Sequence, residues 1–317
     1  MTSRILLCLV SLGLTGCPLV VKEPTHVDSS NSVQLVVLGN VQDAGSPHIG
    51  CVKSCCKDLH KKPDPSRQVV SLGIIDHKAN SSYLFDATPD ITAQLAYLQS
   101  VDTALSILPS GVFLTHAHIG HYTGLMYFGK EAINANCVPI YTMPRMDNFL
   151  KRNGPWNQLV LLDNIELLPI QNEKPVLLSN NLKVTPFLVP HRDEYSETVG
   201  YVITGPSKSA LFIPDIDKWE KWETNIIDVI KEVDYAFIDA TFFDGDEIKS
   251  RDISQIPHPF VIESMELFAD LTPEEKAKVY FIHMNHTNPL LNPKSQQSKT
   301  VEKAGFNIAR LGQSFDL

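Results

Sequence analysis

The 317-residue sequence has too few basic residues to balance its acidic ones. Lys and Arg number 27 and Asp and Glu number 36, so the formal net charge is −9. Because nucleic-acid phosphates are bound by basic surfaces, this balance argues against a general nucleic-acid-binding protein. A small anionic substrate held by a metal remains compatible with it. The chain also has no internal tandem repeat, and its 43% hydrophobic and 20% charged residues are typical of a globular protein.

The chain also lacks a hydrophobic run long enough to span a bilayer as a helix. The apolar stretch Ile5 to Leu14 is too short, but it follows Arg4 and leads into Leu14-Thr15-Gly16-Cys17, which fits a bacterial lipoprotein cleavage box. An ordinary secretory signal with a chance cysteine is the alternative. We expect three segments: 1–16, a lipoprotein signal peptide; 17–33, a lipidated N-terminus and polar tether; and 34–317, one folded domain.

Lipid on Cys17 would place the protein on a membrane surface through its anchor alone. Pro18, rather than Asp, follows the cysteine. In a double-membrane bacterium we therefore expect an exported lipoprotein of the outer membrane, facing the periplasm.

Only six cysteines are present, and three of them are crowded together as Cys51-x3-Cys55-Cys56. An exported protein could form disulfides, but adjacent cysteines bridge only with strain. The crowding favours a structural zinc site.

Three histidines lie within six residues, directly after the apolar run Val112 to Leu114. In an extended segment, residues two apart point the same way, so His116 and His118 can bind one cation together. His121 begins the next segment, and we expect Gly120 to permit a sharp turn before it. A lone histidine is more often a core residue, but three at this spacing indicate a metal.

Other ligand-type residues also follow short β-like runs, as expected for sites at strand ends in layered α/β folds. They are His191, Asp215 and His283. Five histidines and one bridging carboxylate can hold two divalent cations, roughly 3.5–4 Å apart in two-metal hydrolases. A zinc-type ion lowers the pKa of bound water toward about 7, which favours hydrolysis by metal-activated water.

The motif order resembles that of the metallo-β-lactamase superfamily from about residue 34 onward. The family pattern is His-x-His-x-Asp-His, followed by a distant His, a bridging Asp and a final His. The resemblance implies an α/β fold, a four-layer αββα sandwich. It implies a first metal held by His116, His118 and His191, and a second, with the catalytic groups, at His121, Asp215 and His283. Gly120 stands where the family has Asp, so we expect the second metal to be held more weakly.

Several stretches are similar to the pyrroloquinoline quinone biosynthesis protein B group and to related cyclic phosphodiesterases. They are Asp43 to Pro47, the cluster of Cys51, Cys55 and Cys56, Thr115 to Gly124, and Phe281 to Pro289. In the phosphodiesterases a histidine three residues beyond the final active-site histidine joins a cysteine cluster. This implies a structural zinc held by Cys51, Cys55, Cys56 and His286, with the choice between Cys55 and Cys56 open and His48 in reserve.

The resemblance also suggests residues around the metals. Asp86 and Asp239 would support the ligands from behind, although each could simply cap a strand. Candidate substrate-contacting residues are Tyr122, Arg192, Asn285, Thr287 and Asn288. His258 is either an acid or base at the site or an exposed loop histidine, and residues 242–259 form a long loop of the kind that walls a site.

The leading hypothesis is a metal-dependent hydrolase of a phosphodiester or related ester, with one or two Zn²⁺ ions at the active site and one structural zinc. One alternative is an oxidative enzyme related to quinone-cofactor biosynthesis, with Fe or Mn at the active site. Another is a metal-stabilised binding protein with a degenerate site.

The remaining pattern alternates strands and helices. Expected strands are 33–38, 69–75, 83–85, 138–141, 165–168, 182–188, 199–204, 210–213, 234–239 and 279–282, and expected helices are 89–98, 124–135 and 143–152.

Overall fold

Residues 33–248 and 256–317 are described by the structure, which is a computed structural model. The expected signal peptide, Cys17 and the tether up to Ser32 lie outside these residues, and Val33 belongs to the first strand rather than to the tether. In the described ranges, no helix is both long and apolar enough to cross a bilayer.

The first half of the chain forms a seven-stranded mixed sheet in the order β14-β1-β2-β3-β4-β5-β6. Strands β1 to β3 pair antiparallel, and β3 to β6 pair parallel. The strands are β1 (Val33–Gly39), β2 (Ser71–Asp76), β3 (Ser81–Phe85), β4 (Gly111–Phe113), β5 (Val138–Thr142), β6 (Ile165–Pro169) and, returning from the far end of the chain, β14 (Ser314–Asp316).

A second seven-stranded sheet follows, in the order β13-β12-β11-β10-β9-β8-β7. Strands β10 to β13 pair parallel, and β7 to β10 pair antiparallel. The strands are β7 (Val176–Leu177), β8 (Lys183–Leu188), β9 (Val199–Thr204), β10 (Ser209–Ile213), β11 (Tyr235–Asp239), β12 (Val279–Ile282) and β13 (Asn307–Ile308).

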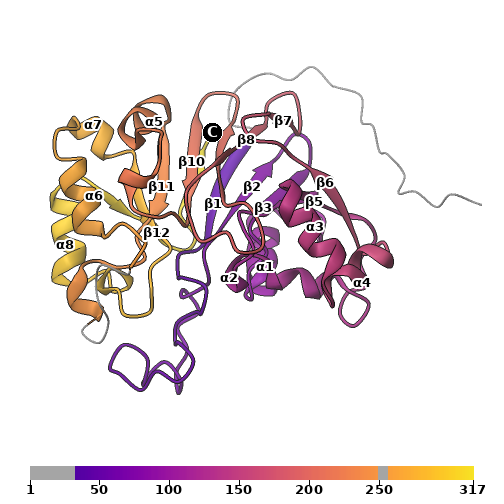
Figure 1. Cartoon of the computed structure of the whole chain (residues 1–317), viewed down its shortest axis with the longest axis horizontal. Helices are drawn as coiled ribbons and strands as arrows, with labels where there is room; N and C mark the ends of the chain where they lie inside the picture. Colours follow the sequence, from indigo (N-terminus) through magenta and orange to yellow (C-terminus); the bar gives the residue numbers. More distant parts are fainter. Residues whose placement is uncertain (1–32, 249–255) are drawn as a thin grey trace, which may run out of the picture.

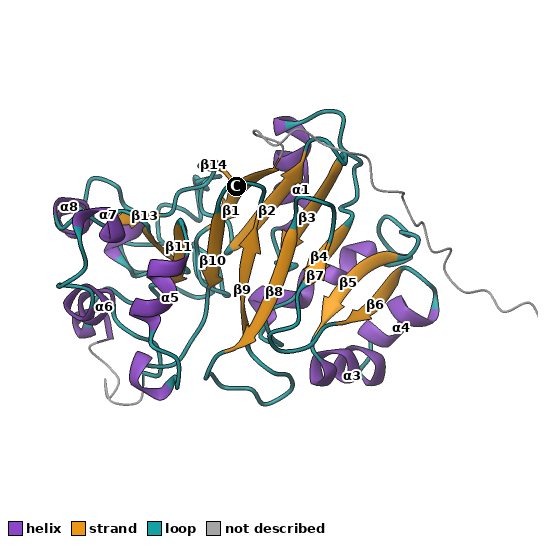
Figure 2. Cartoon of the chain, turned by 90° about the horizontal axis from the view of Figure 1, so that it is seen from above, coloured by secondary structure: helices purple, strands orange, loops and turns teal. Residues whose placement is uncertain are grey.

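Helices cover the outer face of each sheet (Figures 1 and 2). Against the first sheet lie α1 (Ile91–Val101), α2 (Ile119–Tyr122), η1 (Thr123–Phe128), α3 (Pro144–Arg152) and α4 (Trp156–Leu161). The second half contributes η2 (Trp219–Lys221), α5 (Ile226–Glu232), η3 (Gly245–Ile248), α6 (Val261–Leu267), α7 (Pro273–Lys276), η5 (Pro289–Leu291) and α8 (Gln296–Lys303). The expected α/β four-layer αββα sandwich is confirmed.

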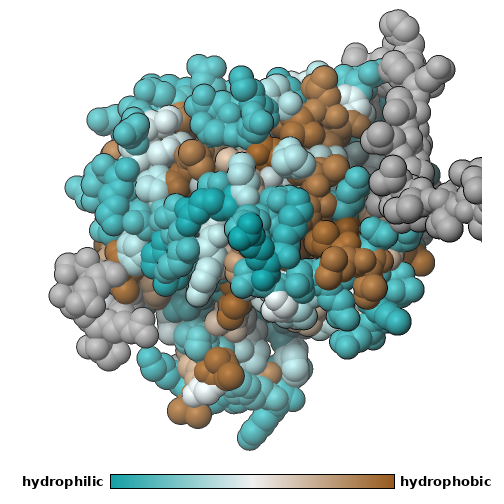
Figure 3. Space-filling view, turned by 45° about the vertical axis from the view of Figure 1, so that its right-hand side comes forward, coloured by the Kyte–Doolittle hydropathy of each residue, from teal (hydrophilic) through white to brown (hydrophobic). Residues whose placement is uncertain are grey.

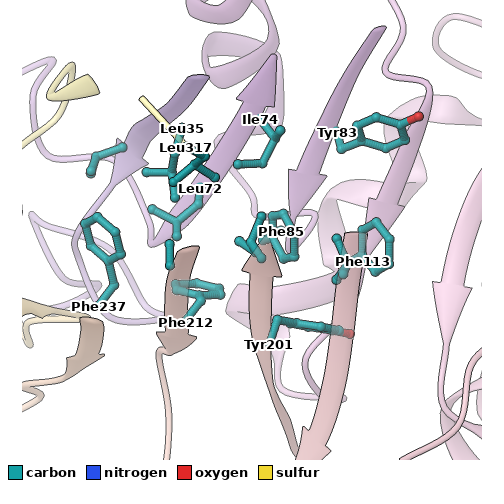
Figure 4. Close-up of a cluster of buried hydrophobic side chains, with 14 of the residues drawn as sticks. Leu35, Leu72, Ile74, Tyr83, Phe85, Phe113, Tyr201, Phe212, Phe237 and Leu317 are labelled. Carbon is teal, nitrogen blue, oxygen red and sulfur yellow. The ribbon is translucent and has the colours of Figure 1, made fainter. Parts of the chain in front are cut away.

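Aromatic side chains from both sheets fill the central layer (Figure 4). Phe113 of β4 stacks on Phe85 of β3 with ring centroids 5.2 Å apart, and Tyr201 of β9 meets Phe113 edge-on at 5.6 Å. The Tyr201 hydroxyl donates a hydrogen bond to the Leu114 carbonyl, so its polar end is satisfied within the core. Each such side chain stabilises the sandwich by about 1.5–3 kcal/mol through burial. The aromatic contacts fix the two sheets face to face.

Most expected strands agree with the structure to within two residues, because short apolar runs mark strands in a buried sheet. The expected helix at 124–135 is wrong. It is replaced by η1, which ends at Phe128 because the next residue, Gly129, has an extended backbone, and by turns after it. The sharp turn expected at Gly120 is also wrong, because Gly120 lies inside α2.

The surface is mainly polar. Figure 3 shows hydrophilic residues over much of one face, with apolar residues gathered toward one side of it. Part of the long connection between β1 and β2 projects from the sandwich as a lobe (Figure 1).

Candidate metal centre

The strands that deliver the ligand-type residues all end at one edge of the sandwich. In the first sheet β1, β3 and β4 run in the same direction, and in the second β8, β10, β11 and β12 do so, as their pairings require. Side chains just beyond these strands therefore converge between the sheets.

One group of ligand atoms consists of His116, His118, His191 and Asp215, which offer atoms within 4.8 Å of one another. His116 Nε2 lies 2.8 Å from His118 Nδ1. Asp215 Oδ2 lies 3.4 Å from His116 Nε2 and 3.3 Å from His191 Nε2. The three histidines are the set expected from the sequence for the first metal, and Asp215, expected at the second metal, also faces them.

A second group combines His121, His283 and Asp215 with Asp43, again within 4.8 Å. Asp215 Oδ2 is 4.0 Å from both His121 Nε2 and His283 Nε2, so one carboxylate oxygen faces both groups. Asp43 was not expected here. The only sequence signal for it was its place in the Asp43 to Pro47 stretch, about 75 positions before the histidine motif.

The buried polar atoms of the two groups fit a divalent metal. His191 Nε2 is buried without a hydrogen-bond partner, and Asp215 Oδ1 is met only by the ion-pair contact of His258 Nδ1 at 3.1 Å. His116 Nε2 and His118 Nδ1 point toward each other, so the two nitrogens are placed to bind one ion together. Buried polar atoms without partners are costly, and imidazole nitrogens with a carboxylate are ligands that zinc accepts. The donor set therefore suits divalent cations.

The opposite ring nitrogens are held by neighbouring side chains, which orient the imidazoles. The Nδ1–H of His121 can donate to Asp86 Oδ2 at 2.7 Å, and that of His191 to Asp217 Oδ1 at 3.2 Å. His283 Nδ1 lies 2.9 Å from the Thr241 hydroxyl. Such partners fix tautomers and raise ligand basicity. The interpretation of Asp86 as a support holds, since it also accepts a hydrogen bond from the Thr115 backbone N–H at 2.8 Å.

His258 is buried at the centre rather than exposed in a loop. Its Nδ1 lies 3.1 Å from Asp215 Oδ1 and 2.9 Å from Asp239 Oδ2. Burial lowers the pKa of His258, but the charges of Asp239 and Asp215 outweigh it and raise the pKa well above its usual value. The two carboxylates therefore favour the protonated form of this ring, which lies beside the two ligand groups.

The same competition acts on the ligands. Burial raises the pKa of Asp215, yet the surrounding histidines hold it well below its usual range. Burial lowers the pKa of His116 well below its usual value, which keeps that ring neutral and able to bind a metal.

The cysteine cluster forms a third group in the lobe after β1. Cys51, Cys55, Cys56 and His286 offer atoms within 4.8 Å of one another, so both Cys55 and Cys56 are within reach. Burial lowers the pKa of His286 to about 4, leaving it neutral. His48, held in reserve from the sequence, instead packs its ring on His286 with centroids 4.3 Å apart.

A pocket of about 530 Å³ lies beside the two active-site groups. Its lining includes the cationic side chains Lys53 and Arg192, together with His258, Asn285 and Thr287. The expected loop contributes Phe242, Glu247, Ile256 and Pro257 to the wall.

Two of the expected substrate contacts lie elsewhere. Tyr122 is buried against Trp156 and Phe149, because the apolar cluster under α3 and α4 takes up its ring. Asn288 is also buried and donates its side-chain amide to the Ala240 carbonyl at 2.7 Å.

This fold and arrangement of groups are those of a metallo-β-lactamase-type protein. The chain belongs to the metallo-β-lactamase superfamily, since a family model described as a β-lactamase superfamily domain matches residues 82–284. Among curated relatives it is similar to Coenzyme PQQ synthesis protein B of Nitrosococcus oceani, 24% identical over 312 residues, covering 86% of this chain and 96% of the relative.

Two solved structures share the fold. The Zn²⁺-bound PqqB from Methylobacterium extorquens has a TM-score of 0.73 at 22% identity, covering 90% of this chain and 100% of its own. A diphosphatase from the PhnP family has a TM-score of 0.60 at 21% identity, covering 90% of this chain and 97% of its own.

Proposed function

We propose that this protein is a metal-dependent hydrolase of a small anionic phosphodiester or related phosphate ester. The observation that carries the proposal is the position of Asp215 Oδ2, which lies between two ligand groups and within 4.0 Å of a histidine nitrogen in each. Divalent ions held by these residues, with zinc as the favoured ion, supply Lewis-acid activation of water and substrate. The name of the PhnP-family diphosphatase adds support for a phosphate-containing substrate.

Pocket side chains account for an anionic substrate. Lys53 and Arg192 place positive charge in a pocket beside the two groups of metal-ligand residues. Asn285 provides a further hydrogen-bonding side chain on the wall. The overall charge of −9 would otherwise repel an anion, so this local charge determines where it binds.

His258 supplies the proton that the leaving group requires. When water adds to phosphorus, the bond from phosphorus to the departing alcohol oxygen breaks, and that oxygen takes the Nε2 proton of the His258 ring. The proton that the attacking water loses then restores the ring for the next turnover. Asp239 and Asp215 hold the ring in place, and their charges raise its pKa, which favours the protonated form. The products are an alcohol and a phosphate monoester.

Turnover of two phosphodiesters tests this proposal. We expect the zinc- or manganese-loaded protein to hydrolyse both an alkyl phosphodiester and bis-p-nitrophenyl phosphate. His258→Gln should slow the alkyl ester about 10²- to 10⁴-fold, the usual contribution of a general acid, and the nitrophenyl ester much less, because nitrophenolate leaves without a proton. His77→Gln, at an exposed histidine paired with Asp102, is the matched control. Absence of turnover of either ester by the loaded protein would overturn the proposal.

The relatives' name favours a second candidate, an iron- or manganese-type oxidative enzyme acting on a precursor of a quinone cofactor. Its histidine-rich centre suits such a metal. Oxygen consumption by the iron-loaded protein, without phosphodiester turnover, would favour this candidate over hydrolysis.

The cysteine group is proposed to hold one structural zinc through Cys51, Cys55, Cys56 and His286. Because structural zinc contributes directly to folding, Cys51→Ala or His286→Ala should lose soluble protein. In the unmodified protein, a thiol-reactive mercurial should release one zinc that a chelator does not remove. A disulfide involving Cys55 or Cys56 in a crystal structure would contradict this assignment.

A further inference from the structure

We infer that Asp43 provides the carboxylate ligand to the second metal that the superfamily motif places at position 120, and that Gly120 is required because Asp43 occupies the space. The ligand has moved from the histidine motif to the segment after β1, about 75 positions earlier in the chain. This inference rests on the metal centre of the proposed function, but it does not depend on the substrate.

The first observation is the direction of the Asp43 side chain. Its Oδ1 lies 2.8 Å from His121 Nε2 and 3.1 Å from His283 Nε2, the two nitrogens that face Asp215 Oδ2 from the other side. Only 12% of the Asp43 side chain is exposed. Asp43 Oδ1 thus contacts His121, which follows a strand of the first sheet, and His283, which follows a strand of the second. An ion bound by both histidines would lie within reach of this oxygen.

The second observation is steric. A Cβ atom built on Gly120 would lie 2.4 Å from Asp43 Cα, 2.7 Å from its Cβ and 2.9 Å from its Cγ. An aspartate at position 120 and the present Asp43 would therefore occupy the same volume. Gly120 has no left-handed backbone angle to explain it, since it lies within α2. The lack of a side chain at position 120 leaves room for Asp43, and the Asp43 carboxylate takes the place of the missing Asp.

The third observation is that backbone hydrogen bonds to both sheets fix the Asp43 segment. Gln42 N–H donates to the Met284 carbonyl at 2.9 Å, and Met284 N–H donates to the Asn40 carbonyl at 2.8 Å. Val70 N–H donates to the Val41 carbonyl at 2.8 Å. Asp43 is therefore held on a rigid element, which a ligand position needs.

Counting and titrating metals tests the inference without any substrate. The full-length protein, stripped of its active-site ions with a chelator, is titrated with Co²⁺ while its visible absorption is followed, and zinc content is measured separately after dialysis. We expect two active-site ions in the unmodified protein. In Asp43→Asn and Asp43→Ala, affinity for one ion should fall by more than the roughly 10- to 100-fold that loss of an outer partner costs.

Asp76→Asn is the matched control, since this buried carboxylate at the end of β2 accepts from the Lys78 and Ala79 N–H groups and belongs to none of the ligand groups. Its two active-site ions should be retained. Asp43→Asn keeps the side-chain volume, so it remains informative if Asp43→Ala does not fold. Unchanged affinity for the second ion in Asp43→Asn, or a single active-site ion in the unmodified protein, would overturn the inference. Because no substrate is used, the Asp43 assignment can fail while phosphodiester turnover succeeds. The Asp43 assignment can also hold while phosphodiester turnover is absent.

Discussion

At the scale of single residues, the metal centre depends on side chains such as Asp86 and Asp217, which hydrogen-bond to the ligand histidines and fix their orientation. Asp86 and His283 each follow a strand with φ in the left-handed region, 70° and 64°. Such angles cost energy in residues other than glycine and persist where the surroundings fix them. Here the hydrogen bonds of Asp86 to His121 and Thr115 fix the first of them.

Asp86→Asn tests this holding role. Asparagine tolerates the left-handed angle and can still accept from the Thr115 N–H, so the fold should be kept. The carboxylate that orients His121 is lost, and we expect the second active-site ion to bind about 10- to 100-fold more weakly. Calorimetric titration with Zn²⁺ measures this, and equal affinities for the variant and the unmodified protein would contradict it.

Glu247 should give the protein a distinctive pH dependence. Burial raises the pKa of its carboxyl to about 7, whereas an unfolded Glu titrates near about 4.3. Between these values the native state binds more protons than the unfolded state, so the contribution of Glu247 to stability falls as pH rises through the window.

Glu247→Gln should remove that fall, because the neutral amide oxygen can still accept from the Phe243 N–H while the amide NH₂ donates to the Thr287 hydroxyl. Relative to the unmodified protein, the variant should gain up to about 3 kcal/mol of unfolding free energy between pH 5 and pH 8, values chosen to bracket the window. Urea unfolding of both proteins at each pH measures this. Parallel stability curves would show that Glu247 is not protonated in the native state.

At the scale of elements, α2 is too short to be held by its own hydrogen bonds and depends on what it packs against. Its Gly120 faces the backbone of the segment after β1. That contact joins the histidine motif to the Asp43 segment, so a larger side chain at position 120 should displace Asp43.

Gly120→Ala adds one methyl group and removes no ligand. Because its Cβ would lie 2.4 Å from Asp43 Cα, we expect the Asp43 segment to shift. Overpacking of this kind costs about 1–3 kcal/mol of stability, and the second active-site ion should be lost on dialysis. Ile119→Ala, at the exposed neighbouring position, is the control. Full retention of both ions by Gly120→Ala would show that the contact is not tight.

The elements themselves were largely predictable, because apolar runs such as Val279–Ile282 mark buried strands and the ligands follow them directly. His116, His118, His121, His191, Asp215 and His283 were therefore found from the sequence and are brought together by the fold. Asp43 was not found, because its position depends on how the segment after β1 crosses between the sheets. The burial of His258 depends on Asp239 and Asp215, which are far from it in sequence.

At the scale of the whole molecule, the N-terminal segment remains a sequence-based proposal, because residues 1–32 lie outside the part of the chain that the structure describes. Cys17→Ser should release the protein from membranes while leaving its folded domain intact. Fractionation of cells that express each form, with thermal unfolding as the check on folding, measures this. A variant that remains in the membrane fraction would exclude lipid on Cys17 as the anchor.

The ligands of the second group come from opposite ends of the domain, since Asp43 and His283 are 240 positions apart. During synthesis, N-terminal segments emerge first. Asp43 and His121 are therefore made long before His283, and the second ligand group can form only after β12 has been synthesised. Binding of the second ion therefore requires nearly the whole domain to have been synthesised, whereas the first group needs only residues up to Asp215. For an exported protein binding of the second ion would follow translocation, and the ion bound would be set by the metal supply of the destination compartment rather than by that of the cytoplasm.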